Sequence, residues 1–164
     1  MATMLFTALE CGAQPLNSNC TTITNLDLKR YMGRWYEIAR FDHSFERDMG
    51  YCEAFYAERS DGRISVTNTG INLRTGKRKT SYGKAKAGDR PGQLRVSFFW
   101  IFYSDYNILA LDDDYEWALV GSKSPKYLWI LSRRRHIDST TRQHIVDIAE
   151  RCGYRTQDLI WVKQ

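Results

Sequence analysis

The stretch LKRYMGRWYEIARF, which runs from Leu28 to Phe41, decides the fold. Leu28, Tyr31 and Met32 recur at one-turn spacing behind Asp27, which is a good helix cap. This pattern predicts a short helical turn. Gly33 then interrupts the helical pattern, and residues 35–39 read as the start of a strand. Because glycine lets the backbone pass close by, the indole of Trp35 could plug one end of a barrel. The alternative is an ordinary core tryptophan on a first strand.

The composition is that of a packed globular protein. The chain has 164 residues, of which 43% are hydrophobic and 13% aromatic, and this length suits one domain. A net charge of +5 makes an anionic ligand or surface plausible. The basic residues are scattered among acids, however, with short clusters only at 77–79 and 133–135. That distribution favours a solvated face over a nucleic-acid site, and no apolar run approaches the roughly 18 residues of a membrane span.

From residue 51 onward the sequence reads as successive strands with short connections. Strands are predicted at 51–59, 63–69, 106–111, 116–121 and 127–132, and the alternation of Leu94, Val96 and Phe98 with polar residues adds another. Ser60-Asp61-Gly62 is a hairpin signal between the first two. About eight strands in this order favour an all-β, eight-stranded antiparallel up-and-down barrel, because closure removes exposed edges. A β-sandwich is the competing architecture, and the last three strands are apolar on both faces.

One amphipathic helix follows the strands. Ile145, Ile148, Ala149 and Cys152 form an apolar stripe that begins after Asp138-Ser139 and stops at Gly153. We expect this C-terminal helix to pack on the outside of the barrel. A final short strand is predicted at 159–162.

The first 25 residues differ from the rest and are predicted to be a leader, either flexible or the remnant of a signal peptide, before a barrel domain at 26–164. We expect Cys52 to pair with Cys152, which would tie the C-terminal segment to the barrel and stabilise the fold by about 4–5 kcal/mol. Cys11 and Cys20 could pair with each other or stay free. Disulfide use indicates a compartment outside the cytoplasm.

Three motifs together resemble the lipocalin family. They are Gly33-x-Trp35 after a helical turn, Asp113-Asp114-Tyr115 between two strands, and Arg133 at the end of the eighth strand. The family's second motif usually has threonine where Asp113 stands here. The segments GRWYEIARF, ALVGS, YLWILSR and LIWV are most similar to the bacterial lipocalin and apolipoprotein D branch.

The resemblance implies structural roles for Gly33, Trp35, Asp114, Tyr115 and Arg133, with the arginine packed across the indole at the closed end of the barrel. Such a cation–π contact is worth about 0.5–2 kcal/mol. No catalytic role is implied for these residues.

The resemblance also implies a cavity for an apolar guest such as a fatty acid or a lysophospholipid, held without a cofactor. Each buried methylene would contribute about 0.8 kcal/mol. Some of the inward-pointing residues could instead fill a tight core. By alignment with the family, the predicted wall comprises Ala54, Tyr56, Val66, Asn68, Phe98, Tyr106, Ile108, Trp129 and Leu131.

An aromatic segment and a cysteine raise the question of further partners and of an enzymatic activity. Phe99, Trp100, Ile101 and Phe102 would lie at the open mouth, where they could contact a membrane surface or a second copy of the chain, or fold inward as ordinary core. No nucleic acid, metal or enzymatic activity is expected, since no catalytic or metal-ligand motif is present. A lipocalin-type enzyme that uses Cys52 as a barrel nucleophile is the alternative. The implied location is extracytoplasmic: the outer membrane or periplasm in a bacterium, or secreted otherwise.

Overall fold

The computed structural model describes residues 20–99 and 102–164. Cys11, most of the predicted leader, Trp100 and Ile101 lie outside these residues, as does the side chain of Phe99. Predictions that concern them are therefore not addressed by the structure.

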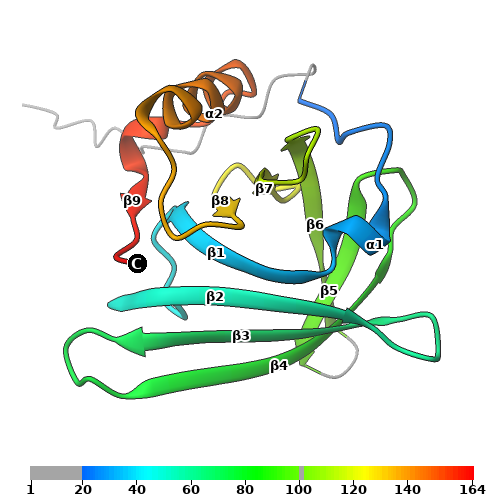
Figure 1. Cartoon of the computed structure of the whole chain (residues 1–164), viewed down its shortest axis with the longest axis horizontal. Coiled ribbons are helices and arrows are strands. Elements are labelled where there is room, and N and C mark those ends of the chain that lie inside the picture. The colour runs from blue at the N-terminus through cyan, green and yellow to red at the C-terminus, as the bar shows by residue number, and fades with distance from the viewer. Residues whose placement is uncertain (1–19, 100–101) are drawn as a thin grey trace, which may run out of the picture.

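Eight antiparallel strands close into a barrel, which confirms the predicted fold class and excludes the sandwich (Figure 1). Consecutive strands pair in order around the barrel, and β1 closes it by pairing with both β2 and β8. A ninth short strand is added to β1 on the outside. The strands are β1 (Gly33–Arg40), β2 (Met49–Glu58), β3 (Ile64–Asn72), β4 (Arg78–Ala87), β5 (Gln93–Phe99), β6 (Phe102–Leu111), β7 (Trp117–Gly121), β8 (Leu128–Ser132) and β9 (Ile160–Trp161).

A short helix, α1 (Leu28–Tyr31), leads into the first strand as predicted. The carboxylate of Asp27 accepts hydrogen bonds from the backbone N–H groups of Lys29 and Arg30 and so caps the helix. Gly33 then takes φ +94°, a backbone conformation that side chains with a Cβ rarely adopt. This turn carries the chain from α1 into β1.

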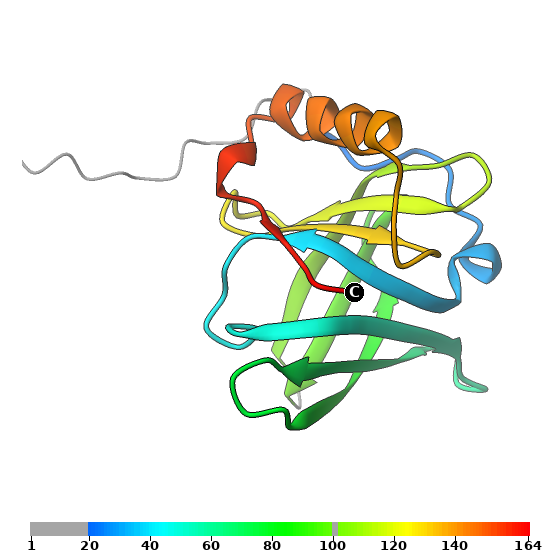
Figure 2. The same cartoon turned by 60° about the vertical axis from the view of Figure 1, so that its left-hand side comes forward.

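The predicted C-terminal helix, α2 (Ser139–Arg151), lies across the outside of the barrel (Figure 2). Asp138 caps its first turn by accepting a hydrogen bond from the N–H of Thr141. The buried residues Ile145 and Ala149 pack with outward-facing strand residues, among them Leu119 and Ile130, in a second apolar core. This core explains why the last strands are apolar on both faces: one face lines the barrel and the other lies beneath α2. A single 3-10 turn, η1 (Thr156–Asp158), precedes β9.

Residues 20–26 run along the barrel before α1 and are called the N-terminal strap here. The N–H of Ile23 donates a 2.9 Å hydrogen bond to the carbonyl of Ile108 on β6. Ile23 and Leu26 also pack against the interior core cluster. Among the helices of residues 20–99 and 102–164, none combines the length and apolarity that a membrane span requires.

Candidate functional site

The closed end of the barrel is sealed by Trp35 and Arg133. Trp35 is fully buried, its indole N–H donates to the carbonyl of Tyr31 (2.8 Å), and the guanidinium carbon of Arg133 lies 3.7 Å from the ring centroid. The guanidinium also donates to three carbonyls, those of Arg30 (2.7 Å), Arg34 (2.7 Å) and Tyr115 (3.3 Å). These carbonyls belong to α1, β1 and the β6–β7 turn, so one side chain fastens three segments at this end.

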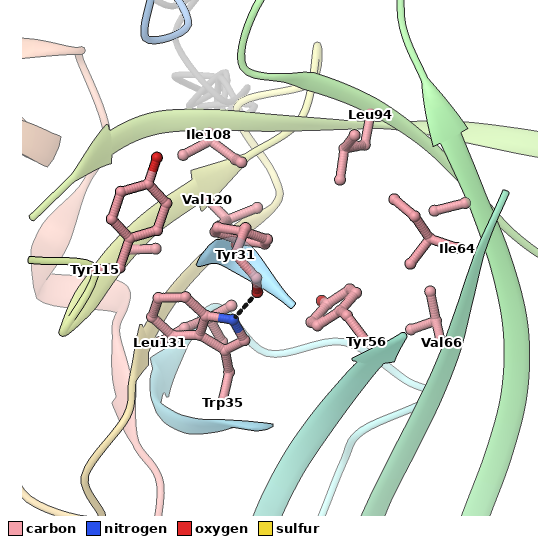
Figure 3. Close-up of a cluster of buried hydrophobic side chains, with 12 residues drawn as sticks. Tyr31, Trp35, Tyr56, Ile64, Val66, Leu94, Ile108, Tyr115, Val120 and Leu131 are labelled. Atoms are coloured by element: carbon pink, nitrogen blue, oxygen red, sulfur yellow. Dashed lines mark hydrogen bonds between the residues drawn. The ribbon is translucent and has the colours of Figure 1, made fainter. Parts of the chain in front are cut away.

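Three tyrosine hydroxyls meet inside the barrel above this seal. The hydroxyls of Tyr31 and Tyr106 are 2.7 Å apart, and Tyr56 donates to Tyr106 across 3.1 Å. Burial raises the pKa of Tyr56 to about 12, so its hydroxyl stays protonated at neutral pH. Figure 3 shows Tyr31, Trp35 and Tyr56 among the buried side chains of this region. Together they form a floor with a small polar centre.

The pairing of the strands agrees with an inward orientation of the nine predicted wall residues. Ala54 is paired with both Trp35 and Asn68, Tyr56 with Val66, and Val120 of the interior core with Trp129. The interior core includes Tyr56, Val66, Ile108 and Leu131 as buried members, with Ala54, Tyr106 and Trp129 partly buried against it. Phe98 is 40% exposed. Its ring lies directly against Gly83, in the space that a Cβ atom on that glycine would need.

Burial varies along the inner face of the barrel. Near the closed end, Ile64 and Val66 are almost fully buried. Farther along the same strand Asn68 is only partly buried, and so is Ala54 beside it. The Oδ1 atom of Asn68 is inaccessible and has no hydrogen-bond partner among the described residues. The partly buried positions Ala54 and Asn68 thus lie between the packed floor and the buried Gly70 and Cys52 farther along the barrel.

The loop between β1 and β2 carries an aromatic group at the mouth. The ring of His43 lies 5.0 Å from that of Phe45, 4.8 Å from that of Tyr127 and 5.1 Å from that of Trp129, measured between centroids. Trp129 also donates its indole N–H to a carboxylate oxygen of Glu46 (3.2 Å). Burial lowers the pKa of His43 to about 4, so the imidazole is neutral at physiological pH.

A buried ion cluster beneath this loop was not predicted from the sequence. Arg40, 2% exposed, donates to a carboxylate oxygen of Glu37 (2.6 Å) and to the carbonyls of Glu46 (2.7 Å) and Met49 (3.1 Å). The carboxylate of Glu46 lies 3.9 Å from its Nε atom. The only signal for this cluster was alternation, because Glu37 lies two residues after Trp35 and so on the same face of β1.

Burial and, to a smaller extent, the neighbouring carboxylate of Glu46 together raise the pKa of Glu37 to about 8, against the opposing effect of Arg40. Burial also raises the pKa of Glu46. One arginine therefore faces two carboxyl groups that both resist ionisation, and the cluster favours holding a proton at neutral pH.

The predicted Cys52–Cys152 disulfide is wrong for this structure. The three cysteines in the described residues are free thiols. Cys52 lies beside inner-face Gly70 of β3, whereas Cys152 belongs to the outer core beneath α2. The barrel wall thus separates the two thiols. Burial, together with the nearby Glu37, raises the pKa of Cys52 to about 12.

Comparison with known proteins decides the family. A family model described as a lipocalin-like domain matches residues 26–164. The chain belongs to the lipocalin family. It is 42% identical to the outer membrane lipoprotein Blc of Escherichia coli K12, covering 99% of this chain and 93% of that protein. It is 36% identical to apolipoprotein D of Macaca fascicularis, and the match covers 85% of this chain and 74% of that protein. The crystal structure of the cockroach allergen Per a 4 shares the fold, with a TM-score of 0.73 at 23% identity over 88% of this chain and 92% of that one.

The second motif of this lipocalin forms the turn between β6 and β7. A carboxylate oxygen of Asp112, a residue outside the predicted set, accepts from the N–H groups of Asp114 and Glu116. Tyr115 takes φ +63°, and its hydroxyl accepts from the N–H of Asp27 across 2.8 Å. The acidic run is thus a capped turn that braces α1. Within the described residues, no group of three or more histidine, cysteine or acidic side chains is placed to hold a metal ion.

Proposed function

We propose that this lipocalin binds and carries a small hydrophobic ligand, such as a fatty acid or a lysophospholipid, in its barrel. The observation that carries the proposal is the partly buried stretch of the inner face at Ala54 and Asn68, next to the buried Ile64 and Val66 of the floor. A twelve-carbon chain placed there would gain roughly 10 kcal/mol from leaving water, before association costs of several kcal/mol. That balance favours acyl chains over small polar ligands.

Binding without catalysis is part of the proposal. The enzyme alternative needs Cys52 as a thiolate, yet its pKa is raised to about 12, so the unreactive thiol predominates at neutral pH. The relatives named outer membrane lipoprotein support an extracytoplasmic location for this chain. A second copy of the chain stays a proposed partner.

Displacement of a fluorescent fatty acid by a panel of lipids tests the proposed binding. Replacing Trp129 with alanine removes an indole from the mouth and its hydrogen bond to Glu46. We expect the affinity to fall by about tenfold, equivalent to roughly 1.4 kcal/mol. Trp161→Ala is the matched control, because this tryptophan lies in β9 outside the barrel. Absence of binding, or equal loss in both variants, would count against the barrel site.

We also propose that the adjoining ends of β5 and β6 contact a membrane surface. Phe102, at the start of β6, is 76% exposed, and Phe98, near the end of β5, is 40% exposed. Cosedimentation with phospholipid vesicles measures the contact, and Phe102→Ser is expected to reduce the bound fraction severalfold. Phe55→Ser, at an exposed phenylalanine in the middle of β2, is the control. Unchanged sedimentation of Phe102→Ser would remove the support for this contact.

A further inference from the structure

Two thiols from opposite ends of the described chain meet on the outside of the barrel. Cys20 begins the N-terminal strap, and Cys152 is the C-terminal cap of α2. Their side chains are joined by a hydrogen bond. Both pack in the outer core, where Cys152 is 8% exposed and Cys20 partly buried. Cys52, in the barrel interior, is remote from this contact.

The backbone on each side of the thiol pair is anchored. Ile23 ties the strap to β6 through its hydrogen bond to Ile108. On the helix side, the N–H of Cys152 donates to the carbonyl of Ile148 (3.1 Å), and that of Gly153 donates to the carbonyl of Glu150 (2.8 Å). The two sulfur atoms are therefore held next to each other by backbone that is already ordered, which lowers the cost of joining them.

Both thiols can be reached from solvent. Cys152 lines an open external groove of about 1220 Å³ between the strap, β6 and α2, together with Thr21 and Ile148. Cys20 lines a neighbouring groove of about 470 Å³. A small oxidant can thus approach the pair without entering the barrel.

The surroundings favour Cys152 as the attacking group. The hydrogen bond from Cys20 lowers the pKa of the Cys152 thiol, and the nearby Arg151 lowers it further, while burial opposes them. Burial and the same contact raise the pKa of Cys20. One thiol of the pair therefore ionises first, which is typical of cysteines that undergo thiol–disulfide exchange.

We infer that Cys20 and Cys152 form a redox-modification site that closes into an intramolecular disulfide by exchange with a small-molecule disulfide such as oxidised glutathione. The Cys152 thiolate attacks one sulfur of the oxidant and expels a glutathione thiolate. Cys20 then loses its proton, attacks the Cys152 sulfur of the mixed disulfide and expels the second glutathione. The protein loses two electrons and two protons, and the oxidant gains both as two glutathione thiols.

Closure would fasten the strap covalently to α2. Among the described residues of the reduced protein, the strap is held by the hydrogen bond from Ile23 to Ile108 and by apolar contacts. In the oxidised protein it could not separate from the helix while the barrel stays folded. Because the proposed location is extracytoplasmic, where disulfides persist, the oxidised form is expected to predominate there.

The test is to incubate the purified full chain with oxidised glutathione and to map its linked peptides by mass spectrometry. We expect the peptide CGYR (152–155) to be linked to the N-terminal tryptic peptide, which contains both Cys11 and Cys20. The link should persist in a Cys11→Ser variant and disappear in Cys20→Ser. Cys52→Ser is the matched control and should leave the link unchanged.

Thermal unfolding supplies a second readout. The linked protein should melt at a higher temperature than the reduced protein, and dithiothreitol should reverse the difference. Cys152→Ser should melt at one temperature under both conditions. A link from Cys11 to Cys20 or from Cys52 to Cys152, or recovery of both Cys20 and Cys152 as free thiols after oxidation, would overturn the assignment. A linked protein that melts with the reduced one would overturn the fastening of the strap.

Discussion

Replacing Trp35 with alanine is expected to lower the free energy of unfolding by about 3–5 kcal/mol, the usual cost of emptying a buried tryptophan site. The indole is fully buried, and its removal would also leave the Arg133 guanidinium without the ring that it covers. The carbonyl of Tyr31 would lose its indole donor. Urea unfolding followed by circular dichroism measures the change.

Trp161→Ala is the matched control for this prediction. Trp161 also lies under an arginine, with the guanidinium carbon of Arg142 at 3.3 Å from its ring centroid, but it is partly exposed and lies outside the barrel. Its loss should therefore cost clearly less. If both variants lose the same stability, the seal at the closed end has no special importance for the fold.

Replacing Arg40 with leucine is expected to cost about 3–5 kcal/mol at pH 8, because it leaves two buried carboxyl groups without a counter-charge. The loss should shrink as the pH falls. Glu37 has a folded-state pKa raised to about 8, above the ordinary value near 4.5 that applies when the chain is unfolded. The stability linked to its proton is therefore complete below about pH 4.5 and is lost as the pH rises through about 8.

Two variants sharpen this prediction. Glu37→Gln cannot ionise, so the decline in stability between pH 5 and 8 should become shallower in that variant. Arg74→Leu removes an exposed arginine that pairs with Asp48 and should leave the unfolding midpoint unchanged. Urea midpoints measured from pH 5 to 9 compare the variants. An Arg40→Leu protein as stable at pH 8 as its parent would mean that the cluster does not hold Arg40 as an ion.

The strands and helices could be predicted because the signals that specify them are local. Asp27 and Asp138 cap helices that begin where expected, and alternation placed Leu94 and Val96 on one face of a strand. Asp61-Gly62 marked the first hairpin turn correctly. In each case the deciding interaction joins residues only a few positions apart.

The pairing of thiols could not be predicted in this way. Cys52 and Cys152 both look like buried cysteines in sequence, yet one faces the barrel interior and the other the core beneath α2. The neighbour of Cys152 is Cys20, from a segment predicted to be part of a leader. Nothing local to Cys20 indicates that the N-terminal strap passes the end of α2.

The sequence by itself determined the succession of strands and the external helix, because periodicity, caps and turns act within one or two elements. Its resemblance to lipocalins indicated the barrel and the residues of the closed end. Only the tertiary structure decided that Glu37 and Arg40 share a buried cluster with Glu46, and that Cys20 meets Cys152. Those outcomes depend on how far each strand is shifted along its neighbour and on where the loops and the strap cross the barrel. The closed barrel sets these positions through contacts between residues distant in sequence, which no local pattern encodes.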